Sequence, residues 1–109
     1  MERMHRFLGT KALTTSETTT PVIDTRQCAG VGYRAIDAIV SVEFYVAAES
    51  QTTRGTPGTK GVLKDRVNVA VTQTCTQGAC YPFPDECFAW PFVYMKANTA
   101  GSIELTGKS

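Results

Sequence analysis

"IVSVEFYVAA", residues 39–48, is the stretch that decides the fold. Its apolar side chains recur at every second position, at Val40, Val42, Phe44 and Val46. This period of two places them on one face of a β-strand and leaves Ser41, Glu43 and Tyr45 on the other. β-branched and aromatic residues dominate the stretch and disfavour a helix. The pattern therefore predicts a half-buried strand.

Similar short segments flank this strand. Strand-like patterns occur in residues 21–24, 30–37, 62–74, 91–97 and 102–107. Inward faces of two of them are marked by Val67, Val69 and Val71 and by Ile103 and Leu105. The turn-like residues 98–101 predict that the last two segments form a hairpin. Residues 49–61, rich in Gly and Thr, predict a long loop. Together these features predict an all-β fold, a single antiparallel β-sandwich or jelly-roll-like domain.

The N-terminal segment has a different composition. Residues 14–20 are Thr and Ser with one Glu, and they bury too little apolar surface to fold alone. The chain therefore divides into an extended N-terminal arm, residues 1–20, and a β-sandwich domain, residues 21–109. One interpretation of the arm is a disordered tail, and the other is a segment that orders against a neighbouring subunit. In the second case the partner-contact candidates are Met4, Phe7 and Leu8.

The charge and hydropathy patterns exclude several classes of protein. Eleven basic and ten acidic residues give a net charge of +1, without the clustered Lys and Arg that bind nucleic-acid phosphates. No apolar run approaches the roughly 18 residues that a membrane-spanning helix needs. The N-terminus does not resemble a secretory signal, because Glu2 precedes a very short apolar stretch. The sequence therefore predicts synthesis in a cytoplasm, with no nucleic-acid or membrane partner.

The four cysteines leave three alternatives open. Disulfide candidates are Cys28, Cys75, Cys80 and Cys87, with Cys75–Cys80 and Cys28–Cys87 as the natural pairings. A structural zinc site is a second alternative, in which Cys28 or His5 supplies a fourth ligand. Buried free thiols that pack as small hydrophobic groups are the third.

The sequence shows no catalytic machinery. The single histidine, His5, lies in the expected arm, far from any cysteine nucleophile that it could activate. Asp85 and Glu86 are adjacent, so they do not form a convergent pair of carboxylates on a strand. Residues 54–61 lack the spacing of a phosphate-binding loop. We therefore expect no enzymatic activity and no cofactor.

The end of the chain resembles a known group of proteins. A turn of the form Y-x-L-P-D-E-x-F is followed by an aromatic strand, an N-T-A-G turn and a strand that ends in K-S. The matching positions are Tyr81, Phe83, Pro84, Asp85, Glu86, Phe88, Phe92, Val93, Tyr94, Lys108 and Ser109. The opening "PVIDTRQCAGVGYRAI", residues 21–36, is similar to the start of the same proteins. The pattern resembles small all-β virion proteins of tailed bacteriophages, of the capsid decoration or cement type; Phe83 replaces a usual Leu, and the cysteines depart from the pattern.

This resemblance implies a structural virion protein that decorates the capsid. It would bind the outside of the shell formed by the major capsid protein and stabilise that shell. A homo-oligomer is implied, with a trimer favoured, located on the capsid surface after synthesis in the host cytoplasm. The alternative is a receptor- or carbohydrate-binding module of a phage fibre or tail. That module would expose Tyr45, Trp90 or Tyr94 as a flat aromatic platform.

Overall fold

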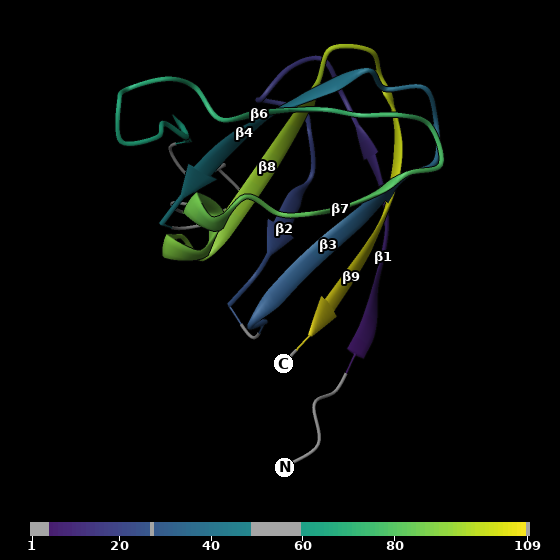
Figure 1. Ribbon diagram of the computed structural model, residues 1–109, viewed down its shortest axis with the longest axis horizontal. Helices are drawn as coiled ribbons and strands as arrows, with labels where there is room; N and C mark the ends of the chain where they lie inside the picture. The colour runs from purple at the N-terminus through teal and green to yellow at the C-terminus, as the bar shows by residue number, and fades with distance from the viewer. Residues whose placement is uncertain (1–4, 27, 49–59, 109) are drawn as a thin grey trace.

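The computed structural model describes residues 5–26, 28–48 and 60–108, and these form two antiparallel β-sheets (Figure 1). The strands are β1 (His5–Leu13), β2 (Val22–Asp24), β3 (Gly30–Ala35), β4 (Ser41–Ala47), β5 (Gly61–Val62), β6 (Thr72–Thr74), β7 (Cys80–Pro82), β8 (Phe92–Ala97) and β9 (Gly101–Lys108), and a 3-10 helix, η1, spans Asp85–Ala89. Sheet A has the order β1-β9-β3-β7. Sheet B has the order β2-β8-β4-β5, and β6 also pairs with β4. The predicted all-β sandwich is confirmed.

The pairing is nested, as in a jelly roll. Strand β1 pairs with β9, β2 with β8 and β3 with β7, so the first half of the chain meets the second half in reverse order. Additional pairing of β3 with β9 and of β4 with β8 then joins these strand pairs into two facing sheets. Figure 1 shows β1, β9 and β3 together on one side and β4 with β8 on the other. A jelly roll of this kind places every strand's inward residues in one shared core.

The core lies between the sheets and matches the alternation of the sequence. Strand β4 buries Val42, Phe44 and Val46, as its period of two predicts. Ile103 and Leu105 of β9 are fully buried opposite them. Val40 is an exception, because it precedes the strand, adopts φ 72° and is 53% exposed.

Strand β1 shows that the N-terminal segment is not an arm over the residues described. His5–Leu13 pairs with Gly101–Lys108 of the same chain at the edge of sheet A. Leu13 is 1% exposed and belongs to the core. A bulge between Phe7 and Gly9 interrupts the pairing, and Gly9 adopts φ 105°, which glycine tolerates without strain. The bulge interrupts the period of two, so the alternation of residues 5–13 does not reveal this strand in the sequence.

The Thr- and Ser-rich residues 14–20 are also part of the folded body. The Thr20 hydroxyl is buried and donates a hydrogen bond to the Met95 carbonyl at 2.7 Å. The Ala97 amide donates to the Thr14 carbonyl at 2.9 Å. Residues 14–20 therefore provide hydrogen-bond partners for backbone groups of β8 that β2 does not reach. The predicted boundary between residues 1–20 and 21–109 does not separate an arm from a domain in the described chain.

Two further predictions are wrong. Strands β8 and β9 belong to different sheets, so residues 98–100 connect the layers and do not close a hairpin. Val67 and Val69 are 76% and 55% exposed in a turn, because the Asp65 carboxylate accepts both of their amides at 2.9 Å. The predicted loop at residues 49–61 lies, up to residue 59, outside the described residues.

Candidate functional site

The partner-contact candidates of the N-terminal segment divide between two faces of sheet A. Phe7 is 63% exposed and pairs with Thr106, whose side chain also points outward. Leu8 points inward, since a Cβ built on Gly107 would lie 2.9 Å from its Cδ1. Leu8 therefore packs within its own chain, and Phe7 remains available to a partner. Met4 lies outside the described residues.

A groove of about 450 Å³ crosses the outer face of sheet A beside Phe7. The strand register places Phe7, Thr106, Gly32 and Pro82 in one row across the four strands. Gly30 and Gly32 form part of the groove lining. A Cβ at Gly32 would lie 3.1 Å from the Tyr81 carbonyl oxygen, whereas a Cβ at Gly30 would meet nothing within 4 Å. Small residues thus keep this sheet surface open, and we call the feature the sheet A groove.

Charged side chains border the sheet A groove. The Arg34 Nε and Glu104 Oε1 atoms are 3.0 Å apart, and both residues line the groove. The hydrogen bond from Arg34 lowers the pKa of Glu104 below its usual value. Lys108 also lines the groove, two register positions beyond Thr106. The groove therefore has a small-residue floor with a polar border, and Phe7 projects from the same sheet face.

The outer face of sheet B has a different construction. Tyr45 of β4 lies opposite Tyr94 of β8, and Tyr94 lies opposite Val22 of β2. Phe92, one outward position along β8, is 8% exposed and Tyr94 is 3% exposed. These side chains form a second apolar cluster outside the main core.

Cations cover the rings of sheet B. The Lys60 Nζ atom lies 4.3 Å from the centre of the Tyr94 ring, and the Arg26 guanidinium carbon lies 5.0 Å from that of Phe92. Lys96 Nζ lies 6.0 Å from the centre of the Tyr45 ring. Such contacts stabilise a cation over the negative face of an aromatic ring. The rings of Tyr94 and Phe92 are therefore largely covered within the chain itself, whereas the cation nearest Tyr45 is at the distance limit of such a contact.

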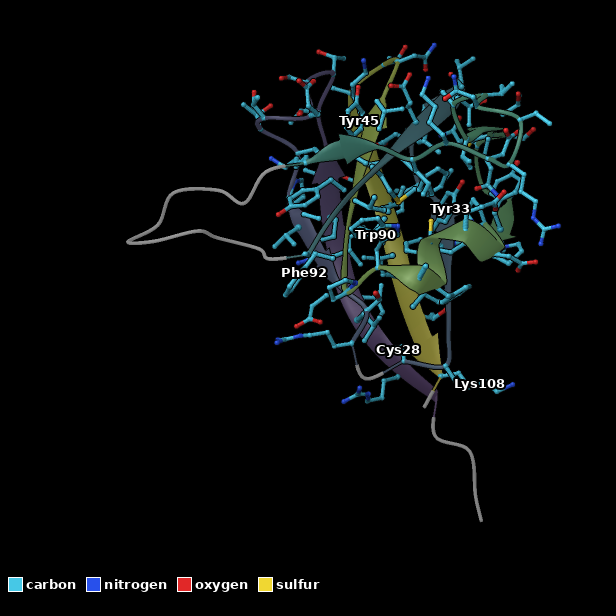
Figure 2. All side chains as sticks on the ribbon, turned by 90° about the vertical axis from the view of Figure 1, so that its left-hand side faces the viewer. Cys28, Tyr33, Tyr45, Trp90, Phe92 and Lys108 are labelled. Carbon is cyan, nitrogen blue, oxygen red and sulfur yellow. The ribbon has the colours of Figure 1, made fainter. Side chains whose placement is uncertain are left out.

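The predicted platform of Tyr45, Trp90 and Tyr94 is not a single exposed surface. Tyr94 is buried, and Trp90 is 41% exposed at the C-terminal end of η1. In Figure 2, Tyr45 lies toward one end of the sandwich, Cys28 and Lys108 lie at the other, and Trp90 and Phe92 lie between them. An extended flat aromatic surface for a ligand is therefore absent at these three residues.

A polar hollow of about 330 Å³ lies on the same face, and its lining includes Glu43, the outward neighbour of Tyr45 along β4. Its polar lining residues are Thr15, Ser41, Glu43, Thr72, Lys96 and Asn98. Glu43 and Lys96 are direct cross-strand neighbours. Desolvation, followed by a hydrogen bond with Glu43, raises the pKa of Tyr45 to about 12. The hydroxyl group of Tyr45 is thus held protonated beside a carboxylate.

The four cysteines are all free in the structure. Cys80 is exposed, Cys28 is half-buried, and Cys75 and Cys87 are buried. Burial, with a smaller effect of the neighbouring Glu86 charge, raises the pKa of the Cys87 thiol to about 12. Cys75 faces the interior and Cys80 faces solvent, so these two predicted disulfide partners point apart. The buried free thiols of Cys75 and Cys87 agree with the alternative in which cysteines pack as small hydrophobic groups.

A zinc site gains no support from the described residues. Among them, no group of three or more His, Cys, Asp and Glu side chains has an arrangement that could hold a metal ion. The side chain of His5 is not among those described.

A buried polar network was not evident from the sequence. The Tyr33 hydroxyl donates to Gln73 Oε1 at 2.5 Å and lies 3.4 Å from Cys75 Sγ. Burial raises the pKa of Tyr33 well above its ordinary value. The alternation of β3 indicates that Tyr33 points inward. Its hydrogen-bond partners are Gln73 in β6 and Cys75 directly after β6, which the sequence does not place near Tyr33. The network joins the two sheets, because Tyr33 belongs to sheet A and Gln73 to sheet B.

The chain matches no protein-family model, no curated protein and no solved structure. In the described part of the chain, no helix is long and apolar enough to cross a membrane. The candidate binding features of the described residues lie on the two outer faces of the sandwich.

Proposed function

We propose that this chain is a structural virion protein that decorates a capsid and binds it through the outer face of sheet A. The observation that carries the proposal is the exposed Phe7 beside the sheet A groove. The resemblance of residues 81–109 to small virion proteins of tailed bacteriophages supplies the class of partner. Jelly rolls are frequent in viral capsid proteins and in lectins, which is an analogy of fold only.

The groove suits an extended segment of another protein. Because Gly30 and Gly32 have no side chains, a strand or loop of the major capsid protein can approach the sheet backbone closely. Phe7 would enter a pocket on the partner, since buried aromatic side chains dominate the energetics of protein interfaces. Arg34, Glu104 and Lys108 would form the polar border of that contact.

The contact of one copy would be weak, and its repetition would make it effective. A standard protein interface buries roughly 800 Å² on each partner, so the sheet A groove would supply only one part of the contact. A protein that binds only the assembled shell stabilises that shell by mass action. Association of copies into a trimer would place three such contacts on a three-fold position of the capsid and multiply the effective affinity. In this proposal the protein is made in the host cytoplasm, acts on the capsid surface and catalyses no reaction.

The test is co-sedimentation of the purified chain with shells assembled from the major capsid protein of the same genome. We expect the unaltered chain to sediment with the shells and to raise the temperature at which they open. Phe7→Ser and Gly30→Val should each reduce the bound amount at least tenfold. Gly30→Val fills the groove without a backbone clash, and valine suits a strand, so the fold should persist.

Val67→Ser is the matched control. Val67 is 76% exposed, more than Phe7, but lies in the turn that follows β5. Loss of one exposed apolar side chain there should leave binding unchanged. The proposal fails if the unaltered chain does not bind the shells, or if the two groove variants bind as well as the control. Exclusive binding to a fibre or tail part would favour the receptor-binding alternative.

A further inference from the structure

The polar hollow beside Tyr45 has the chemistry of a small-ligand site on the face opposite the sheet A groove. Residues 14–20, β4, β6 and the end of β8 contribute its polar side chains, so four separate segments converge on one depression. Its volume of about 330 Å³ is at the lower end of the range of ligand pockets, roughly 300–1,000 Å³. A single sugar ring or a molecule of similar size therefore fits the space.

Opposite charges in the hollow are available to a ligand. Glu43 and Lys96 face each other across β4 and β8. The two ion pairs found in the described chain are Arg26–Asp24 and Arg34–Glu104, so Glu43 and Lys96 do not approach within salt-bridge distance of each other. A carboxylate supplies acceptors only and an ammonium group supplies donors only. The hollow thus offers an acceptor and a donor on neighbouring strands.

Neighbouring side chains extend this pattern of donors and acceptors. The Asn98 Oδ1 atom accepts the Ser41 amide at 3.1 Å, which leaves the NH₂ branch of the same side chain as a donor. Thr15 and Thr72 are exposed hydroxyl groups that can donate or accept. Tyr45 is the next outward residue of β4 after Glu43, and its half-buried side chain has a hydroxyl that is hydrogen-bonded to Glu43.

The charge arrangement selects the class of ligand. A phosphate or carboxylate ligand would be repelled by Glu43, and a metal ion would be repelled by Lys96. A purely apolar ligand would leave the polar groups unpaired, which costs free energy. A neutral molecule with adjacent hydroxyl groups satisfies both charges, because each hydroxyl donates to a carboxylate and accepts from an ammonium group. Its apolar C–H face can pack on the ring of Tyr45.

We propose that the hollow between residues 14–20 and strands β4 and β8 binds a neutral pyranose sugar. The ligand would place two adjacent hydroxyl groups between Glu43 and Lys96, a further hydroxyl against Asn98, and its C–H face against Tyr45. This site lies on sheet B and does not depend on shell attachment through sheet A. The two proposals can therefore fail independently.

The test is a titration of the purified full chain with methyl glycosides of glucose, galactose, mannose and N-acetylglucosamine, followed by amide NMR. We expect at least one glycoside to bind with a millimolar dissociation constant and to shift the amide signals of Ser41, Glu43, Lys96 and Asn98. Glu43→Gln and Tyr45→Ala should each weaken that binding about tenfold or more. Oligosaccharides that end in the same sugar, tested next, distinguish a free sugar from the end of a glycan chain.

Glu86→Gln is the matched control, because Glu86 is an exposed carboxylate in η1 that does not line the hollow. It should leave sugar binding unchanged. The proposal is overturned if none of the glycosides shifts these amides at millimolar concentration. It is also overturned if binding survives Glu43→Gln and Tyr45→Ala unchanged, since the sugar would then occupy another place. Retained shell binding by Glu43→Gln separates this result from the fate of the capsid proposal.

Discussion

The two outer faces of this sandwich are both built from antiparallel strands, yet their outward residues are used in opposite ways. On sheet A the outward row contains Phe7, Thr106 and Gly32, and the surface is open. On sheet B the outward Tyr94 and Phe92 are buried beneath cations. Strand β8 is therefore apolar and buried on both faces, whereas β9 alternates between buried and accessible residues. The difference shows that an outward position in a sandwich can either be available for binding or contribute to stability.

The test with the largest expected change in stability truncates one outward side chain on each face. Tyr94→Ala should lower the free energy of unfolding by about 3–5 kcal/mol, as for other large buried aromatic side chains. Thr106→Ala on sheet A should change it by less than about 0.5 kcal/mol, because the side chain is exposed. Urea denaturation followed by tryptophan fluorescence measures both values. Equal effects of the two substitutions would show that the faces do not differ in this way.

Alkaline pH gives the next largest effect and tests the interior and sheet B together. Cys87 in the core and Tyr45 on sheet B each have a pKa of about 12, above the ordinary values of thiols and phenols. A group whose pKa is raised by folding contributes stability that is complete below its unfolded pKa and is lost as the pH rises toward the folded value. The free energy of unfolding should therefore fall from about pH 9 to about pH 12, by at most about 1.4 kcal/mol per pH unit for the buried thiol.

The contribution of Tyr45 should be the smaller one, because its hydroxyl is in contact with solvent and is screened. Urea denaturation at a series of alkaline pH values measures the slope for the unaltered chain, Cys87→Ala and Tyr45→Phe. Cys87→Ala should flatten the slope most, even though its cavity lowers stability at every pH. A slope that is unchanged in Cys87→Ala would mean that the thiol is not held protonated by the fold.

The smallest effect is expected on sheet A, at the Arg34–Glu104 pair. The Arg34 hydrogen bond lowers the pKa of Glu104, so the stabilising contribution is present at neutral pH and is lost as the pH falls through the folded pKa. Glu104→Gln should therefore be slightly less stable than the unaltered chain at neutral pH and equal to it in acid. The difference should also shrink in high salt, because both side chains are about two-fifths exposed. Thermal denaturation at neutral and acidic pH measures it, and a difference that grows in acid would contradict the assigned sign.

The sequence predicts local structure well where one rule operates. Period-two alternation correctly identifies β4 and the inward residues Ile103 and Leu105. The turn at residues 98–100 correctly marks a reversal of the chain, but turn residues do not specify whether the next strand stays in the same sheet. That choice depends on β1 and β3, which pair on either side of β9. The sheet order could therefore not be derived from residues 91–109 alone.

Other errors arise where a side chain or a glycine overrides the pattern. Val67 and Val69 alternate like a strand, yet the Asp65 carboxylate draws both amides into a turn, and Asn68 adopts φ 64°. Adjacent Phe7 and Leu8 break the apolar alternation of β1, and the bulge between Phe7 and Gly9 accounts for this break.

The two candidate sites can be predicted only when the register of the paired strands is known. The sequence predicts Phe7 as a partner-contact candidate, but the groove beside it arises from Gly30 and Thr106, which are far away along the chain. Likewise Glu43 and Lys96 become neighbours only through the pairing of β4 with β8. Composition and spacing do not encode such pairs, because each residue satisfies its own strand in several possible registers.

The pairing of β1 with β9 also has a consequence for the order in which the protein folds. His5 meets Lys108, so the first described strand finds its only partner at the other end of the described chain. On the ribosome, β1 must wait until residues 101–108 have emerged, and its apolar Phe7, Leu8 and Leu13 stay uncovered during that time. Contacts of such large sequence separation slow folding and prolong exposure to aggregation. A circular permutant that joins Lys108 to His5 through a short linker would make β9 and β1 a local hairpin and should fold faster.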